Sequence, residues 1–347
     1  MCTAVTYTTK DHYFGRTFDW EVSYGEQIAF MPRNYPLYFR KQPALKCHYA
    51  LLGMAVVVES VSDGVAAEEN GNAGATQTPL YYDAINEKGL GMAGLNFPDN
   101  TDYKEPAEGM DNIAPFELIP WILGQCETVE DAKGLLERMN LVKIPFGRQY
   151  PLSPLHWIIA DKKEAITVEC VKEGLKVYDN PVGVLTNNPP FDMHMFYLTN
   201  FMQLSGGEPE NRFAEDLCLV PYSRGMGAMG LPGDWSSASR FVRCAFAKKN
   251  SRSGSSEPES VSQFFRILGS VEQIRGCVAL EKRQSGEGIY EISVYTSCCN
   301  LDKGLYYYKT YENSTVSCVD MYREDLEGDQ LSVYPLKREL QVHCQNK

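Results

Sequence analysis

The sequence predicts an α+β fold in which antiparallel sheets carry helices on their outer faces. Segments typical of strands and helices follow one another in blocks, not in the regular alternation that builds a parallel, doubly wound sheet. No segment repeats at a period of about 20 to 50 residues, and no linker clearly divides the chain. The 347 residues, of which 44% are hydrophobic, are enough for a sizeable core. We therefore expect a single domain over residues 2–347.

The chain opens with a predicted β-hairpin. Thr3–Thr9 and His12–Trp20 are rich in β-branched and aromatic residues, which suit a pleated, half-buried surface. Lys10 and Asp11, which join them, are typical of a turn. The second strand is therefore expected to fold back beside the first.

Further strands follow in the first third of the chain. Tyr49–Glu59 contains three consecutive valines and is strand-like. Residues 61–79 are rich in Gly, Ala, Asn and Glu without an apolar period, which indicates a surface loop. Tyr81–Ile85 and Leu90–Asn96 flank a turn-rich tetrapeptide and predict a second hairpin.

The first helices are predicted in the segment that follows. Phe116–Cys126 is apolar and helix-like, although Pro120 should kink it or mark its start. Thr128 can cap a second helix, with Asp131 three residues later as a capping box. The helix then has apolar residues at the spacing of one helical face: Ala132, Leu135, Leu136 and Met139.

The rest of the chain repeats this order of strands, helices and strands. β-rich runs around short polar turns predict the strands Leu155–Ala160, Ala165–Cys170, Gly174–Tyr178, Gly183–Thr186, Tyr290–Ser297 and Leu305–Tyr311. Between them, Ser239–Lys249 and Ser260–Leu268 have the pattern of helices, joined by a Ser- and Gly-rich linker.

Composition and charge exclude several classes of function. A net charge of −12 and a pI near 5.0 argue against nucleic-acid binding, which needs clustered Lys and Arg. No apolar run is long enough to predict a membrane span, and the first residues lack the pattern of a signal peptide. The 11 cysteines and five histidines show no metal-binding spacing. We expect a cytoplasmic protein with reduced thiols, no metal and no cofactor.

The amino end contains a candidate nucleophile. Cys2 follows Met1 directly, and a small second residue permits removal of the methionine. The thiolate is the nucleophilic form of cysteine, and a free α-amine, with a reference pKa of about 7.7 to 8.0, is a base suited to neutral pH. One residue can then supply both nucleophile and base, as in N-terminal nucleophile enzymes. Taken alone, a cysteine at position 2 is a weak signal, and an inert terminal cysteine is the more common explanation.

Arg16 and Asp19 strengthen this interpretation. They lie on the predicted second strand, which the hairpin brings back beside Cys2. An arginine there favours the thiolate over the thiol, and an aspartate can accept hydrogen bonds from the α-amine. The alternative for this pair is a surface ion pair.

Six short motifs, in collinear order, resemble the choloylglycine hydrolase family, which includes bile salt hydrolases and penicillin V acylases. The motifs are Met-Cys-Thr at the start, Phe-Gly-Arg-x-x-Asp at 14–19, Asn-Glu-Lys-Gly-Leu-Gly at 86–91, Gly-Leu-Asn-Phe-Pro at 94–98, Leu-Thr-Asn-Asn-Pro at 185–189, and Leu-Pro-Gly-Asp at 231–234 followed by Ser-Arg-Phe at 239–241. The resemblance extends from residue 2 to about residue 335.

The resemblance implies the αββα four-layer sandwich of N-terminal nucleophile hydrolases and a homotetramer. It implies that Cys2 attacks an amide carbonyl and that Arg16 and Asp19 hold and tune it. By the same resemblance, the other active-site residues are Asn96, Asn187 and Arg240. Asparagine NH groups can stabilise the oxyanion that forms during the attack. The alternatives are turn chemistry for the two asparagines and a salt bridge at the helix start for Arg240.

The family resemblance points to a conjugated bile salt as the substrate. Bile salt hydrolases typically carry asparagine at the position of Asn96, where penicillin V acylases often carry tyrosine. Candidates for the apolar wall around a steroid are Phe18, Leu141, Ile144 and Phe146, for which core packing is the alternative. The 61–79 segment looks longer than the family pattern. Other possible functions are a penicillin V or N-acyl homoserine lactone acylase, acyl transfer to an amino acid, and a catalytically silent binding protein.

Overall fold

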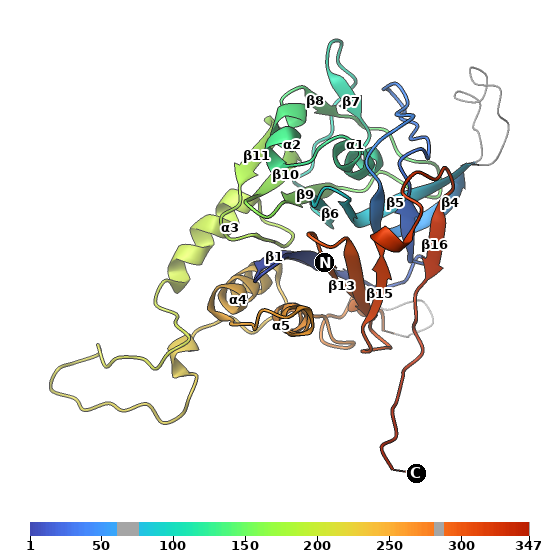
Figure 1. Ribbon diagram of the computed structural model, residues 1–347. Helices are drawn as coiled ribbons and strands as arrows, with labels where there is room; N and C mark the ends of the chain where they lie inside the picture. Colours follow the sequence, from blue (N-terminus) through green and yellow to red (C-terminus); the bar gives the residue numbers. More distant parts are fainter. Residues whose placement is uncertain (61–75, 281–287, 347) are drawn as a thin grey trace.

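The computed structural model describes residues 1–60, 76–280 and 288–346, in which two sheets lie between two layers of helices (Figure 1). The first sheet has the strand order β12 (Val184–Leu185), β1 (Cys2–Thr8), β2 (His12–Trp20), β13 (Ile292–Asn300), β14 (Leu305–Thr310), β15 (Ser317–Asp320). The second has the order β11 (Gly174–Asp179), β10 (Ala165–Val171), β9 (Leu155–Ala160), β6 (Gly91–Asn96), β5 (Thr76–Asn86), β4 (Leu51–Ser60), β3 (Gln27–Met31), β16 (Ser332–Pro335). All recorded pairings in both sheets are antiparallel, as predicted.

The helices cover the outer faces of the two sheets (Figure 1). α4 (Ser237–Asn250) and α5 (Glu257–Gly269) pack on β1 and β13 of the first sheet. α1 (Leu118–Leu123) packs on β5 and β6 of the second sheet, with α2 (Val129–Leu136) beside it. The remaining elements are α3 (Phe191–Leu198), the parallel pair β7 (Asp111–Ile113) and β8 (Met139–Leu141), and the short 3₁₀ helices η1 (Pro115–Glu117), η2 (Thr199–Phe201), η3 (Met226–Ala228) and η4 (Met321–Arg323). This is the predicted αββα arrangement.

The second sheet is buried on both faces, which explains its nearly continuous apolar strands. Successive residues of a strand point to opposite faces. In β9, Ile158 and Ala160 belong to the core between the two sheets, whereas Trp157 and Ile159 belong to the core under α1 and α2. The core between the sheets also contains Cys2, so the candidate nucleophile lies inside the protein and not on its surface.

The β1–β2 hairpin is held closely against β13. Its register pairs Cys2 with Phe18 and Ala4 with Arg16. Gly15 makes this packing possible, because a Cβ atom at that position would lie 2.2 Å from the backbone oxygen of Ser297. The glycine of the Phe-Gly-Arg motif therefore lets the strand that carries Arg16 approach its neighbour.

Several predicted bounds differ by a few residues, and at two places the predicted type of structure is wrong. Residues 76–79 were expected in the 61–79 loop, but they begin β5 and extend its pairing with β4; residues 61–75 lie outside the described part of the chain. Met139 was expected on the apolar face of a helix, but α2 ends at Leu136 and Met139 begins β8, where it pairs with Asp111. A tertiary pairing with a distant strand outweighs the local helical pattern at this position.

Candidate active site

Cys2 is the first residue of β1 and lies on the face of the first sheet that is turned toward the second sheet. It is 3% exposed. Because residues two apart on a strand share a face and paired residues face the same way, Cys2, Phe18 and Arg16 point into the space between the sheets. The hairpin alone therefore brings the thiol and the guanidinium together, as the sequence predicted.

Arg16 is completely buried and has one donor left over. Its Nη1 donates to the backbone oxygens of Gly94, at 2.5 Å, and Tyr82, at 3.1 Å, in the second sheet, and its Nε donates to that of Thr17. Its Nη2 has no hydrogen-bond partner among the described residues. Burial lowers the pKa of Arg16, but the negative charge of Cys2 and of nearby acidic groups outweighs burial and raises it. The side chain thus carries a permanent positive charge beside the thiol.

Asp19 faces the other side of the sheet, because it lies three positions after Arg16 on the same strand. Its carboxylate accepts hydrogen bonds from the hydroxyls of Thr17, at 2.9 Å, and Ser293, at 2.5 Å, and lies 4.0 Å from Nη1 of Arg240. Burial raises the pKa of the Asp19 carboxyl, whereas Arg240 and the N-terminal ammonium lower it. Arg16 and Asp19 therefore lie on opposite faces of the first sheet.

Arg240 ties helix α4 to the first residues of the chain. Its Nη1 donates to the backbone oxygen of Cys2 at 2.5 Å and to the Thr3 hydroxyl at 2.6 Å. Its Nη2 donates to Oδ1 of Asn187 at 2.8 Å. Three acceptors at separate positions suit the forked guanidinium, which a lysine could not replace.

The two asparagines occupy different positions in this group. Oδ1 of Asn187 accepts a hydrogen bond from the backbone nitrogen of Cys2 at 2.7 Å, and its Nδ2 donates to the backbone oxygen of Asn96 at 2.7 Å. One hydrogen of the Asn187 NH₂ group is therefore engaged, and the second makes no recorded hydrogen bond within the described residues. The side chain of Asn96 is half-buried and makes no hydrogen bond within the described part of the chain, so its NH₂ group is free to donate.

Residues that the sequence analysis did not assign hold Asn187 in place. His194 bonds the backbone oxygen of Asn187 at 2.8 Å, and burial lowers the pKa of His194 to about 4, so this ring is neutral. His156 bonds the backbone oxygen of Thr186 at 2.7 Å and pairs with Glu169 at 3.1 Å. No short motif marks these residues, since they come from β9, β10 and α3 and meet only in the folded chain.

The amino group of Met1 is also enclosed. It donates to the backbone oxygen of Asp19 at 2.8 Å and pairs with the carboxylate of Glu291, which is 5% exposed. Burial lowers the pKa of this amino group. Glu291 is a further residue that no motif identified, because it lies more than half the chain away from the terminus.

The four predicted wall residues lie in different surroundings. Phe18 lies beside the nucleophile, with its ring centroid 4.5 Å from that of Tyr82 and 5.4 Å from that of Tyr295. Leu141 is 1% exposed and belongs to the core under α1 and α2, whereas Cys2 and Phe18 belong to the core between the sheets. Ile144 and Phe146 are half-buried in the segment after β8, where Phe146 packs edge-on against Phe116. The assignment of Leu141, Ile144 and Phe146 to a substrate pocket stays a prediction.

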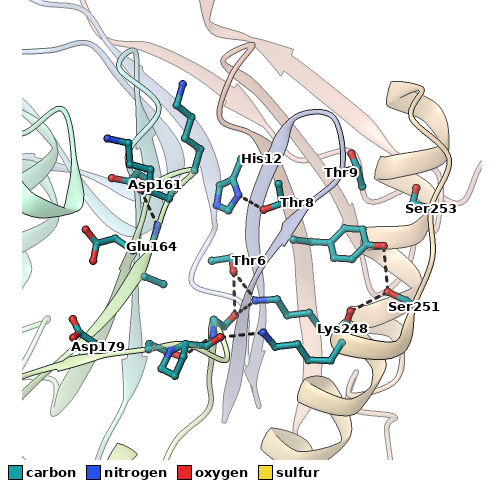
Figure 2. Close-up of a pocket in the computed structure, with 18 of the residues that line it drawn as sticks. Thr6, Thr8, Thr9, His12, Asp161, Glu164, Asp179, Lys248, Ser251 and Ser253 are labelled. Atoms are coloured by element: carbon teal, nitrogen blue, oxygen red, sulfur yellow. Dashed lines mark hydrogen bonds between the residues drawn. The ribbon is translucent and has the colours of Figure 1, made fainter. Parts of the chain in front are cut away.

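A separate cleft of about 720 Å³ lies at the opposite end of the β1–β2 hairpin (Figure 2). Its lining includes Thr6, Thr8, His12, Asp161 and Lys248. The amino group of Lys248 is saturated by the Thr6 hydroxyl and the backbone oxygens of residues 182 and 183. None of the candidate active-site residues lines this cleft.

Two further properties concern the described residues. They contain no group of three or more His, Cys, Asp or Glu side chains arranged to hold a metal ion. None of the helices they form has the length and apolar character needed to cross a membrane.

Comparisons with known proteins place this arrangement in a family. A bile salt hydrolase/transferase of Lactiplantibacillus plantarum is 52% identical over the full length of both chains, and one of Clostridium perfringens is 36% identical, also over the full length of both. The crystal structure of the C2A mutant of the conjugated bile acid hydrolase from Clostridium perfringens superposes with a TM-score of 0.84, covering 100% of both chains at 36% identity. Penicillin V acylase from Agrobacterium tumefaciens shares the fold, with a TM-score of 0.72, 18% identity, and coverage of 97% of this chain and 92% of that one. Residues 2–334 match the linear amide C–N hydrolases of the choloylglycine hydrolase family, and the chain belongs to that family.

Proposed function

We propose that this enzyme hydrolyses the amide bond of glycine- or taurine-conjugated bile salts, with Cys2 as the nucleophile after removal of Met1. One observation carries the proposal. The backbone nitrogen of Cys2 lies 2.7 Å from Oδ1 of Asn187, while the thiol faces Arg16, whose Nη2 is unpartnered among the described residues. A free amine at that nitrogen would be held as a base next to a thiol that a positive charge favours as thiolate.

The reaction then proceeds in two steps. The α-amine of Cys2 takes up the thiol proton, the sulfur attacks the amide carbon, and the oxyanion accepts hydrogen bonds from NH groups of Asn96 and Asn187. The C–N bond breaks as the protonated α-amine gives its proton to the leaving amino group of glycine or taurine. Water, deprotonated by the same amine, cleaves the thioester and restores the thiol.

The roles of the remaining residues follow from their contacts. Asn187 orients the amine through Oδ1. Arg240 holds the backbone oxygen of Cys2 by a hydrogen bond. The carboxylate of Asp19, which is also buried, balances the positive charge of Arg240. Phe18 offers an aromatic surface next to the sulfur for the steroid. This division of roles supports acyl transfer from an amide without a metal or cofactor.

The choice of bile salts rests on the relatives. The protein that is 52% identical is named a bile salt hydrolase/transferase. Its name also supports a second candidate activity, in which an amino acid amine takes the place of water in the second step. Penicillin V remains a competing substrate for the same chemistry, and the acylase from Agrobacterium tumefaciens supports only the shared fold at 18% identity.

A side-by-side substrate panel tests the proposal. Glycocholate, taurocholate and penicillin V are incubated with the purified enzyme, and the released amines or 6-aminopenicillanic acid are quantified. Release from the bile salt conjugates well above that from penicillin V is expected. Adding a second amino acid and detecting its bile acid conjugate by mass spectrometry reports transfer.

We further propose that the protein is a homotetramer, assembled through an arm formed by residues 199–235. The arm extends away from the two sheets between α3 and α4 (Figure 1). It exposes several large apolar side chains, among them Met202 at 84%, Phe213 at 80% and Tyr222 at 82%. Large apolar side chains exposed together are typical of a protein interface, and a second copy of the chain is the occupant proposed here.

We propose that the single domain over residues 2–347 works in the cytoplasm. All 11 cysteines are free thiols, several of them exposed, which suits a reducing compartment. Cell fractionation with an antibody against the protein tests the location, and intact mass tests the removal of Met1.

A further inference from the structure

Asp83 is a carboxylate buried between the two sheets, next to Arg16. It lies on β5 and is fully buried. Its hydrogen-bond partners among the described residues are three hydroxyls from the opposite sheet: those of Tyr295 and Tyr306, each at 2.6 Å, and that of Ser297, at 3.1 Å. The carboxylate thus reaches across from one sheet to the other, as Arg16 does in the reverse direction.

The contacts of Asp83 suit its ionised form. Three hydroxyl donors are directed at its two oxygens, and a protonated carboxyl would have to donate one of these bonds itself. The 2.6 Å oxygen–oxygen distances to Tyr295 and Tyr306 are those of charge-assisted hydrogen bonds. Burial raises the pKa of Asp83, whereas Arg16 and the three hydroxyls lower it.

Two paths of contact connect Asp83 with Arg16. The Ser297 hydroxyl, which donates to Asp83, accepts a hydrogen bond from the backbone nitrogen of Arg16 at 3.1 Å. The ring of Tyr295 stacks on that of Phe18, and the guanidinium of Arg16 lies 5.3 Å from the centroid of the Phe18 ring. The hydroxyl partners of Asp83 therefore also fix the strand and the ring that position the arginine.

The recorded hydrogen bonds of the Arg16 side chain go to backbone oxygens, and none goes to Asp83. The recorded bonds go to residues 17, 82 and 94, and Nη2 is left unpartnered among the described residues. An aspartate in direct contact would occupy that donor. Asp83 instead supplies a negative charge near the guanidinium without a direct hydrogen bond to it. It therefore balances the positive charge and leaves Nη2 available to the sulfur or the substrate.

We propose that Asp83 is the positioning residue for Arg16, and that its charge limits how strongly Arg16 favours the Cys2 thiolate. Limiting the stabilisation of the thiolate favours catalysis, because a thiolate that is stabilised too strongly is a poorer nucleophile. This inference rests on the proposed role of Cys2 as nucleophile.

Other charged groups near Cys2 lie on the opposite, helix-facing side of the first sheet. On the helix side these are Arg240 from α4, Asp19 from β2 and Glu291, which precedes β13. The neighbouring acidic groups Tyr82, Tyr295, Tyr306 and Cys299 stay protonated near neutral pH, because burial raises the pKa of each. Of the two carboxylates whose charge acts on Arg16, Asp83 and Asp19, Asp83 is the one that lies between the sheets.

The test is the Asp83→Asn variant, which keeps the shape and removes the charge. Two readouts are measured across pH 4 to 9: kcat/KM with glycocholate, and the rate at which iodoacetamide alkylates Cys2, followed by peptide mass spectrometry with exposed Cys47 as internal reference. Removing a negative charge favours the thiolate, so both acid limbs should move to lower pH by roughly half a unit to one unit. At the alkaline plateau, kcat should fall. A properly folded variant whose acid limbs coincide with those of the parent would overturn the proposal.

A matched control and a second variant keep the outcome clear. Asp161→Asn removes another buried carboxylate, at the opposite end of the hairpin in the cleft of Figure 2, and should leave both acid limbs in place. If Asp83→Asn does not fold, Asp83→Ser carries the same loss of charge with room for a water molecule. Failure of the parent enzyme to release glycine would contradict the proposed function, whereas the alkylation profile tests Asp83 whatever the substrate is.

Discussion

Oδ1 of Asn187 lies 2.7 Å from the backbone nitrogen of Cys2, although 185 residues separate the two in the sequence. This contact gives Asn187 a position at the amine end of Cys2, in addition to the oxyanion role that stays a prediction. The sequence analysis expected both asparagines to stabilise an oxyanion. The bonds of Asn187 place its Oδ1 at the amine end of Cys2, and the second hydrogen of its Nδ2 makes no recorded bond within the described residues.

Replacing Asn187 should therefore impair the base. In Asn187→Ala, the amine of Cys2 loses its acceptor, and we expect kcat/KM to fall by about 10²- to 10³-fold. Steady-state kinetics with glycocholate measures the effect, and intact mass confirms that Met1 is still removed. Asn100→Ala, which removes only a bond to the backbone oxygen of Pro98, is the control and should keep parent activity. An unimpaired Asn187→Ala enzyme would contradict the assignment.

The role of Cys2 is tested by changing one atom. Cys2→Ser should lose measurable hydrolysis while its melting temperature and circular dichroism stay close to those of the parent, because serine fits the same buried space. Cys47→Ser, at an exposed cysteine, should leave activity unchanged. Hydrolysis at the parent rate by the Cys2→Ser enzyme would rule out the proposed nucleophile.

Arg240→Lys should damage both activity and stability. Lysine keeps the charge but cannot reach the oxygens of Cys2, Thr3 and Asn187 together. Because buried acceptors lose their partner, we expect a loss of about 2–3 kcal/mol in the free energy of unfolding. Urea denaturation measures this, with the exposed Arg252→Lys as control. Equal stability of the Arg240→Lys protein and the parent would show that the fork is not needed.

Stability should fall in mild acid because of His12. Burial, with a contribution from Lys248, lowers the pKa of His12 from 6.5 to about 4, so the folded protein holds this ring neutral. Below pH 6.5 the His12 ring is protonated in the unfolded chain but stays neutral in the folded protein. The contribution of the neutral, buried ring to the free energy of unfolding is therefore present above pH 6.5 and is lost as the pH falls toward 4. Between pH 6.5 and 5 this amounts to about 2 kcal/mol.

His12→Gln should reduce that dependence on pH. Glutamine can keep a hydrogen bond to the Thr8 hydroxyl but takes up no proton. Urea denaturation at pH 6.5 and pH 5 should show a smaller difference for this variant than for the parent, whereas His343→Gln in the exposed tail should behave like the parent. Identical differences in all three proteins would remove His12 as the cause.

Charges placed on the arm should break the tetramer. Phe213→Asp combined with Tyr222→Asp puts two carboxylates where apolar side chains are now 80% and 82% exposed. Light scattering after size exclusion should then report a smaller assembly at micromolar concentration. Leu340→Asp, at an exposed apolar residue of the C-terminal tail, is the control. A parent protein that is already monomeric would refute the tetramer directly.

The parts of the fold that depend on local sequence were predictable. The β1–β2 hairpin and the capping box of α2 agree with their turn and cap residues, because neighbouring residues decide them. The position of Arg16 beside Cys2 followed from the same hairpin. The spacing of three between Arg16 and Asp19 also implies opposite faces of a strand, a consequence that the motif alone did not suggest.

Contacts between layers were not predictable from patterns along the chain. Asp83 meets Tyr295 across 212 residues, and His156 supports the backbone of Thr186 from another sheet. Such pairs have no fixed spacing, so composition and periodicity cannot reveal them. The same limit explains Met139, whose partner Asp111 precedes the helix that its spacing seemed to continue.

The place of β1 within its sheet determines when the site can exist. β1 lies between β12 and β2, and β2 in turn lies against β13, which ends at Asn300. The hairpin can therefore place Arg16 beside Cys2 early in synthesis. Asn187 and Arg240, which contact the backbone nitrogen and oxygen of Cys2, follow it by 185 and 238 residues. These contacts at the chain end can form only after α4 has left the ribosome.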